Sequence, residues 1–229
     1  YERHGWQSTH TVITVVSTDR PFIIDSLRME LNRQDLSIHA INNVVLNTER
    51  DAKGALIGFN HKGKGHLESI VAIEVDRHTD ADKLEQIRTE LLASLDEVRA
   101  SVDDFKPMLD AVSEQLAHLK KVSASLSKKD VAEATAFLEW MQVNFTFLGY
   151  EVFDLRKAGK QQSLQPVEGS GLGLLRECNK ECREKFLDAD NLNADQHTLL
   201  PDLISFSKAA AKSRVHRPAY PDYIGFKRF

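Results

Sequence analysis

The chain has 229 residues, of which 41% are hydrophobic and 28% charged, and its formal net charge is -4. This composition is typical of a globular protein with enough chain for one large domain or two small ones. The slightly acidic balance excludes a general attraction to nucleic acid or anionic membranes, and no apolar stretch approaches the roughly 20 residues that cross a bilayer. Because only two cysteines occur, we expect no disulfide framework and predict a cytoplasmic protein. The charge and the short apolar stretches predict no membrane partner.

The first hundred residues predict strands and helices in the order β-α-β-β-α-β. Segments rich in Val and Ile, or with alternating apolar residues, predict strands. Apolar residues at intervals of three and four predict helices, and a polar stretch with several glycines predicts a loop. The predicted strands are 10–17, 37–48, 69–76 and 97–102, the loop is 49–65, and the helices start near Pro21 and Thr79. This order predicts a ferredoxin-like α+β domain with two helices on one face of an antiparallel sheet.

The remainder of the chain predicts helices followed by a strand-rich module. Apolar residues at helical spacing follow Asp103, and Ser127 is expected to cap a second helix. The runs FTFLGYEVF, LISFSK and DYIGFKRF predict strands, and ECNKECREKFL predicts a helix. We therefore divide the chain into a first domain at 1–102, a helical connector at 103–127 and a second, mostly antiparallel α/β module at 128–229. The chain starts without a methionine and stops inside a strand-like segment, so we expect a piece of a longer protein with a truncated second module.

The segment STDRPFIIDS predicts a turn from the first strand into the first helix. Asp19 is expected to cap this helix, and Pro21 to lie in its first turn, where a missing N–H has no cost. The N–H groups of a helix N-terminus can bind an anion or a carboxylate. Arg20 would add a positive charge, and Asn42 and Asn43 on the neighbouring strand would add amides. On chemistry alone we favour a capped turn with exposed charges over a binding site, because such caps are common.

No set of residues in the chain predicts catalysis or a metal centre. Cys178 and Cys182 would share a helix face, with His197 as a further ligand. Structural zinc needs four ligands, so we favour two unlinked thiols. The chain has no G-x-S-x-G elbow, no H-E-x-x-H pair and no Walker loop. The stretch GSGLG lacks the Lys-Ser/Thr ending of a phosphate loop and predicts a turn.

The tail from Lys208 to Phe229 combines positive charge with aromatic residues. It holds six Lys or Arg, one acidic residue and four interleaved aromatic residues. Such a pattern can bind single-stranded nucleic acid, but it also fits a strand whose aromatic side chains pack inward. Because the whole chain is acidic, we favour the strand and predict no nucleic-acid partner.

Several stretches of the chain resemble known families. The run HTVITVVSTDRPFIIDSLRMELNRQDLSIHAINNVV resembles an ACT domain, whose signature turn is often D-R-P-G. Phe22 stands at the glycine position, where its large ring fills space. The pattern D-x-P-F-hydrophobic-hydrophobic-D-S, with FLEWMQVNFTFLGYEVFDL, GSGLGLLR and SRVHRPAYPDYIGFKRF, resembles the N-terminal region of the large NAD-specific glutamate dehydrogenases of bacteria. These stretches span almost the whole chain.

This resemblance implies a non-catalytic region for regulation and subunit association, whose second module is PAS-like. The implied partners are the catalytic core of the same polypeptide and further copies of the chain. NAD is the implied cofactor of the parent enzyme, with none in this region. An amino acid is the candidate effector. The candidate effector-binding residues are Asp19, Arg20, Pro21, Phe22, Ile23, Asp25, Asn42 and Asn43. The alternative interpretation is a free-standing regulatory protein with tandem ACT and PAS-like modules that bind small molecules.

Overall fold

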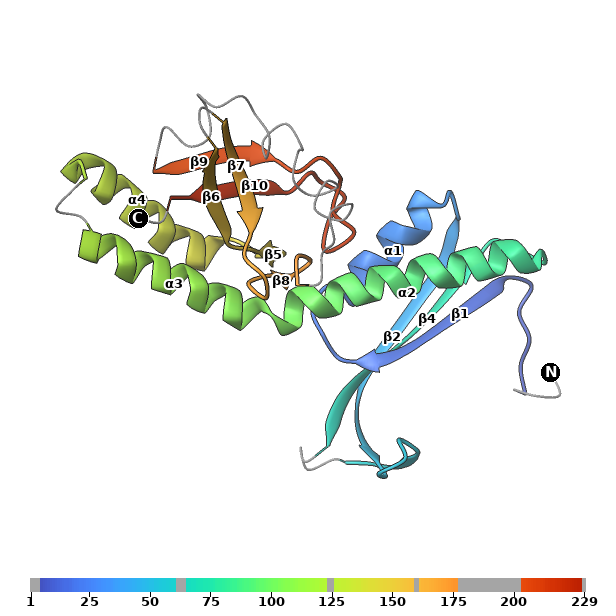
Figure 1. Cartoon of the computed structure of the whole chain (residues 1–229). Helices are drawn as coiled ribbons and strands as arrows, with labels where there is room; N and C mark the ends of the chain where they lie inside the picture. The colour runs from blue at the N-terminus through green and yellow to red at the C-terminus, as the bar shows by residue number, and fades with distance from the viewer. Residues whose placement is uncertain (1–4, 61–64, 123–125, 159–160, 177–202, 228–229) are drawn as a thin grey trace. The chain divides into compact units, whose positions relative to one another are not determined.

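The computed structural model describes residues 5–60, 65–122, 126–158, 161–176 and 203–227, which form two compact units (Figure 1). The first unit comprises Tyr1–Val98 and Arg214–Arg217, and the second comprises Arg99–Ser213 and Pro218–Phe229. Cys178, Cys182, His197 and the helix predicted for ECNKECREKFL lie outside the described residues. The first unit is therefore discontinuous in sequence, because it includes the short segment Arg214–Arg217.

The first unit contains a four-stranded antiparallel sheet with the strand order β1-β4-β2-β3 (Figure 1). The strands are β1 (Thr11–Thr18), β2 (Ile38–Arg50), β3 (Leu56–Phe59) and β4 (His66–Val75). The helices are α1 (Ile23–Arg33) and α2 (Ala81–Asp103), the latter continuing into the second unit. The α+β class predicted from the sequence is confirmed.

The core of the first unit lies between one face of the sheet and the two helices. Alternate residues of β4 are fully buried, as the period of a strand dictates when one face is covered. The buried apolar residues of these elements are Val71, Ile73 and Val75 on β4, Ile23, Leu27 and Leu31 on α1, and Ile87, Leu91 and Val98 on α2. The alternating pattern at 69–76 therefore identified a strand with one buried face.

The strand predicted at 97–102 is wrong, because this segment is the last part of α2. Leu91, Ser94, Val98 and Ser101 are all buried, and their intervals of three and four place them on one helix face. The fourth strand of the sheet is instead β3, inside the stretch predicted as a loop. The unit thus has the order β-α-β-β-β-α.

The start of α1 also differs from the prediction. The helix begins at Ile23, so Pro21 precedes its first turn and Asp19 does not cap it. Phe22 is the N-cap residue, with φ 73° and no capping hydrogen bond from its side chain. The helix ladder begins with Ser26 N–H donating to the Phe22 carbonyl at 2.9 Å. The glycine position of the turn therefore keeps a left-handed backbone although a phenylalanine occupies it.

The start of α2 differs by one residue. The cap predicted at Thr79 is at Asp80, whose carboxylate accepts the Asp82 N–H at 2.9 Å. The first turn of the helix therefore keeps an acidic cap, which a helix N-terminus favours.

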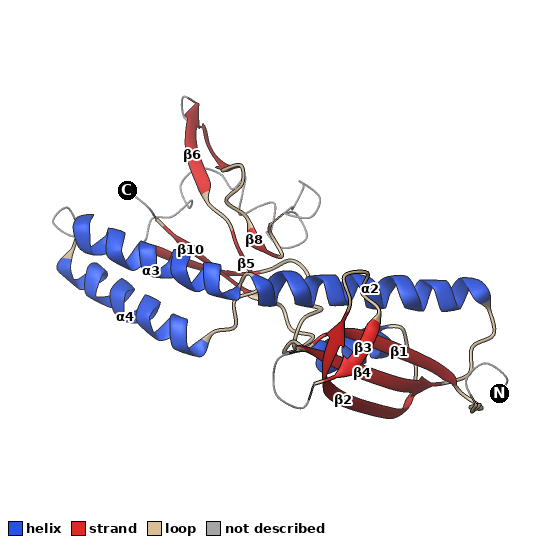
Figure 2. Cartoon of the chain, turned by 90° about the horizontal axis from the view of Figure 1, so that it is seen from below, coloured by secondary structure: helices blue, strands red, loops and turns tan. Residues whose placement is uncertain are grey.

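The second unit packs two helices beside three antiparallel strand pairs. Helices α3 (Phe105–Val122) and α4 (Lys128–Asn144) lie side by side in Figure 2 and share a core. The pairs are β5 (Gly149–Tyr150) with β8 (Leu172–Gly173), β6 (Phe153–Ala158) with β7 (Gln161–Pro166), and β9 (Ile204–Lys208) with β10 (Asp222–Phe226). Ser127 caps α4 as predicted, since its hydroxyl accepts the Asp130 N–H. The strands predicted for LISFSK and DYIGFKRF are confirmed.

The GSGLG stretch is a tight structural turn. Gly173 has φ 61°, and a Cβ at this position would lie 2.3 Å from the Leu148 carbonyl oxygen. The Gly173 N–H donates to the buried carboxylate of Asp104 at 2.7 Å, and Arg176 donates to the same carboxylate. This close approach of two backbone segments explains why a glycine is needed at position 173, and no phosphate-binding role is required.

Candidate functional site

An open pocket of about 370 Å³ lies where β1 turns into α1. The turn after β1 and the first residues of α1 form one side of the pocket, while β2 and β4 each contribute one residue. The lining residues are Asp19, Arg20, Phe22, Ile23, Ile24, Asp25, Asn43 and Ser69. The first unit alone supplies all of them.

Six of the eight candidate effector-binding residues line this pocket, and Pro21 and Asn42 do not. The pairing of β2 with β4 explains the difference between the two asparagines. Asn43 is opposite Val71, whose side chain is buried on the helix-covered face. Asn42 is opposite Ala72 and, because side chains alternate along a strand, lies on the other face.

Two lining residues, Ile24 and Ser69, are not among the candidates that the sequence indicates. Ile24 directly follows the predicted turn, and its place in the first turn of α1 brings it to the pocket. Ser69 is 50 residues from Asp19 in sequence but is opposite Ser17 in the sheet. Ser69 alternates in step with Val71, Ile73 and Val75, which indicates the same buried face of the strand. The pairing of β4 with β1 that places Ser69 beside the turn does not follow from this pattern.

The pocket presents groups of both signs to a ligand. The first N–H groups of α1 have no partner within a helix ladder, and the Phe22 side chain does not cap them. These N–H groups form a partial positive charge that suits a carboxylate. Asp19 and Asp25 add carboxylates, and Arg20 adds a guanidinium. The pocket is therefore chemically suited to a small zwitterion.

Phe22 forms part of the pocket wall and does not close the pocket. Its ring packs against the ring of His216, with the two centroids 4.8 Å apart. His216 also has a left-handed backbone, with φ 70°. The Phe22 ring was expected to fill the space at this turn. Part of that space remains open as the pocket, and the ring lies against His216.

The described residues contain no metal-binding cluster and no membrane span. Within the parts of the chain that the structure describes, no three His, Cys, Asp or Glu side chains gather as metal ligands. No helix in those parts is both long and apolar enough to cross a bilayer.

Residues 1–91 match the family model described as glutamate dehydrogenase, ACT1 domain. The match covers the sheet, α1, the turn pocket and the first half of α2. The predicted ACT character of the first domain is therefore confirmed.

The whole chain is also similar to curated enzymes. It is 41% identical over 235 residues to an NAD-specific glutamate dehydrogenase of Halomonas elongata, covering 100% of this chain and 15% of the enzyme. It is 40% identical over 236 residues to an NAD-specific glutamate dehydrogenase of Pseudomonas aeruginosa, covering 99% of this chain and 14% of that enzyme. The matched part is the N-terminal region of these enzymes, so the predicted resemblance is confirmed.

Proposed function

We propose that this chain is the non-catalytic N-terminal regulatory region of an NAD-dependent glutamate dehydrogenase. The parent enzyme would convert L-glutamate and NAD to 2-oxoglutarate, ammonia and NADH. The catalytic core of the same polypeptide would be the main partner, and NAD would be a cofactor of that core. The ACT1 match and the relatives' much greater length support this proposal. The cytoplasmic location stays a prediction from cysteine content.

The regulatory role rests on the pocket at the β1–α1 turn. We infer that its effector is a free α-amino acid. The ligand carboxylate would accept hydrogen bonds from the first N–H groups of α1, and the ammonium would pair with Asp19 or Asp25. The Asn43 amide would donate or accept a further hydrogen bond. These groups match the two charges that all α-amino acids share.

Isothermal titration calorimetry of the chain with a panel of the twenty L-amino acids tests this role. We expect saturable heat with at least one of them, lost in Asp19→Asn and Asn43→Ala. Asn42→Ala is the matched control, because its side chain lies on the other face of the same strand. No heat with any amino acid, or equal loss in the Asn42→Ala control, would contradict an amino-acid effector at this pocket.

A second role, association of copies of the chain, is supported by the open face of the sheet. Val16 and Val44 are each opposite Ile70, so three apolar side chains form a row across β1, β4 and β2. Val16 is 52% exposed and Val44 is 45% exposed. The neighbouring row of Thr14, Ala72 and Asn42 is uncharged. In a two-fold dimer the same surface of each copy packs on the other. These rows suit such packing because no charge would be buried.

A further inference from the structure

A four-residue segment, Arg214–Arg217, belongs to the unit of the ACT1 domain although it lies far beyond it in sequence. Its flanking residues, Ser213 and Pro218, belong to the second unit. We call these four residues the strap. The strap therefore returns to the ACT1 domain while both of its ends continue into the second unit.

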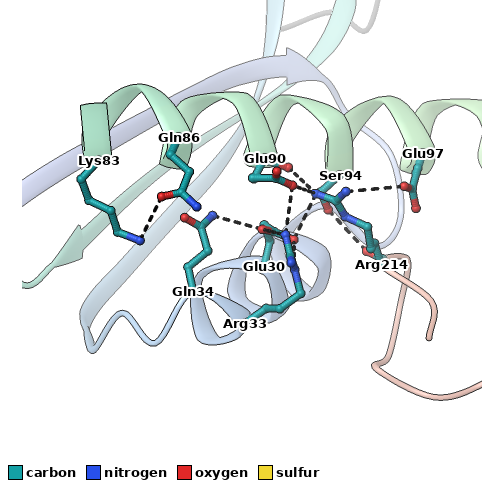
Figure 3. A network of polar contacts seen from close by, with 9 residues as sticks. All are labelled: Glu30, Arg33, Gln34, Lys83, Gln86, Glu90, Ser94, Glu97 and Arg214. Atoms are coloured by element: carbon teal, nitrogen blue, oxygen red, sulfur yellow. Dashed lines mark hydrogen bonds and ion pairs between the residues drawn. The ribbon is translucent and has the colours of Figure 1, made fainter. Parts of the chain in front are cut away.

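Arg214 binds three carboxylates that project from α1 and α2 (Figure 3). Its guanidinium donates to the carbonyl and the carboxylate of Glu90, both at 2.8 Å. It lies 3.2 Å from the Glu30 carboxylate and 3.9 Å from that of Glu97. The Ser94 hydroxyl donates to the Arg214 carbonyl at 3.4 Å. The strap is thus attached through both its side chain and its backbone.

Loss of this attachment would be costly at Glu30, because the Glu30 side chain is only 1% exposed. A buried carboxylate without a cation is costly. Arg33 donates to both Glu30 oxygens, at 2.9 and 2.6 Å, and Gln34 donates at 3.1 Å. Arg214 supplies the second guanidinium, so removal of the strap leaves this carboxylate with one cation in place of two.

His216 of the strap contacts the first turn of α1 and the residue before it. The His216 N–H donates to the Ser26 hydroxyl at 3.3 Å, and Ser26 is fully buried. Val215 is 1% exposed, and the His216 ring packs on Phe22. Phe22 and His216 both hold left-handed backbones, which non-glycine residues keep only where surrounding contacts determine them. The contact between the two rings therefore joins two positions with unfavourable backbone conformations.

We propose that docking of the strap and the conformation of the pocket wall at Phe22 are coupled, with the strap-docked state the one that binds ligand. Phe22 contacts His216 on one side and lines the pocket on the other. A ligand that contacts Phe22 and the first turn of α1 then has different affinities for the docked and undocked states, which is the condition for coupling. The ligand-binding part of this proposal rests on the proposed effector site.

Hydrogen exchange of the whole chain, followed by mass spectrometry, tests the coupling without a ligand. Arg214→Gln should speed exchange of the hydrogen-bonded amides of α1, from Ser26 onward, by about tenfold or more, because it leaves Glu30 and Glu90 short of a cation. Phe22→Gly should reciprocally speed exchange in the strap. Two control variants should leave exchange in the strap and in α1 unchanged. Arg217→Gln changes an exposed residue of the strap, and Arg88→Gln removes only an exposed pair with Glu85.

The reciprocal design keeps the test decisive if one variant fails to fold. Circular dichroism identifies such a variant, and the Phe22→Gly arm then decides through exchange in the strap alone. Unchanged exchange in the strap of folded Phe22→Gly, or unchanged exchange at α1 in folded Arg214→Gln, would overturn the coupling. Exchange as fast in the Arg217→Gln control as in Arg214→Gln would also overturn it.

The amino acids of the titration panel separate this proposal from the proposed function. A bound amino acid should slow exchange in the strap, and His216→Ala should weaken its binding by about fivefold or more. Binding with unchanged strap exchange and unchanged affinity in His216→Ala overturns the coupling and leaves the effector site intact. If no amino acid binds while the reciprocal exchange effects are found, the effector assignment fails and the structural coupling stands.

Discussion

Three non-glycine residues in the described part of this chain have left-handed backbone conformations. Phe22, Asp35 and His216 are the non-glycine residues with positive φ in the described part. Phe22 and His216 pack on one another beside the pocket, while Asp35 follows the end of α1. Such conformations cost about 1 kcal/mol or more for an L-residue. Phe22 and His216 are in contact across the fold, whereas Asp35 ends α1 through local hydrogen bonds, with the Leu36 N–H donating to the Leu31 carbonyl at 3.1 Å.

Two glycines of one stretch should respond differently to alanine. Gly169→Ala should cost about 1 kcal/mol of unfolding free energy, because φ is 74° but nothing lies within 4 Å of the new Cβ. Gly173→Ala should cost about 1–3 kcal/mol more, because its Cβ would meet the Leu148 carbonyl oxygen at 2.3 Å. Urea unfolding of both variants measures the difference. Equal losses would contradict the close approach at Gly173.

Asp76 should stabilise the first unit only above acidic pH. Hydrogen bonds from Ser37 and His39 lower the pKa of Asp76 from 3.8 to about 2. A carboxyl with a lowered folded pKa contributes stability above its unfolded pKa and loses it as pH falls toward the folded pKa. Wild type should therefore be more stable than Asp76→Asn near neutral pH.

Urea unfolding of wild type and Asp76→Asn at a series of pH values checks this expectation. The difference in unfolding free energy should shrink between about pH 5 and pH 2. Asp82→Asn is a control, because this exposed carboxylate, in the first turn of α2, is remote in sequence from the Ser37 and His39 contacts. A difference that stays constant over this range would show that the hydrogen bonds at Asp76 do not carry the effect.

At the scale of elements, the junction of α2 and α3 is held by one buried carboxylate. Asp104 lies between the two helices and is 1% exposed. Its oxygens accept the Gly173 N–H and the Arg176 guanidinium. Helical hydrogen bonds continue through it, since Asp104 N–H donates to Ala100 and its carbonyl accepts from Met108. The junction thus anchors the glycine turn to the helices of the second unit.

Asp104→Asn should lower the unfolding free energy by about 1.5–3 kcal/mol, the range for hydrogen bonds to a charged group. The loss should stay below that of a fully buried ion pair, because the Arg176 side chain is 55% exposed and water can solvate it. Asp110→Asn is the matched control on α3, with an exposed pair to Lys106 worth less than about 1 kcal/mol. Equal effects of the two substitutions in urea unfolding would remove the special role of Asp104.

At the scale of the whole molecule, the open sheet face predicts self-association. Val44→Asp would place an unpaired charge in the apolar row and should shift the chain toward the monomer. Light scattering coupled to size-exclusion chromatography measures the shift. Val143→Asp is the control, since this side chain on α4 is 83% exposed and lies in the other unit. A wild-type monomer, or equal behaviour of both variants, would contradict association through this face.

Local patterns predicted most elements of this molecule and part of the pocket. The strand at β4, both helices of the first unit and the cap at Ser127 follow from periodicity and from one capping residue. Six of the candidate effector-binding residues line the pocket, and all of them apart from Asn43 lie in the turn or in the first turn of α1. The error at 97–102 arose because a short apolar run fits a strand or the end of a helix equally well.

The sequence by itself indicated the resemblance to an ACT domain and the turn between the first strand and first helix, because the residues of this turn are close together along the chain. Only the tertiary structure decided that β3 completes the sheet, that Ser69 reaches the pocket and that the strap packs on Phe22. These three features depend on strand register and on the burial of Glu30 against two guanidiniums. Such long-range complementarity leaves no periodic trace in the sequence, so it is visible only once the chain is folded.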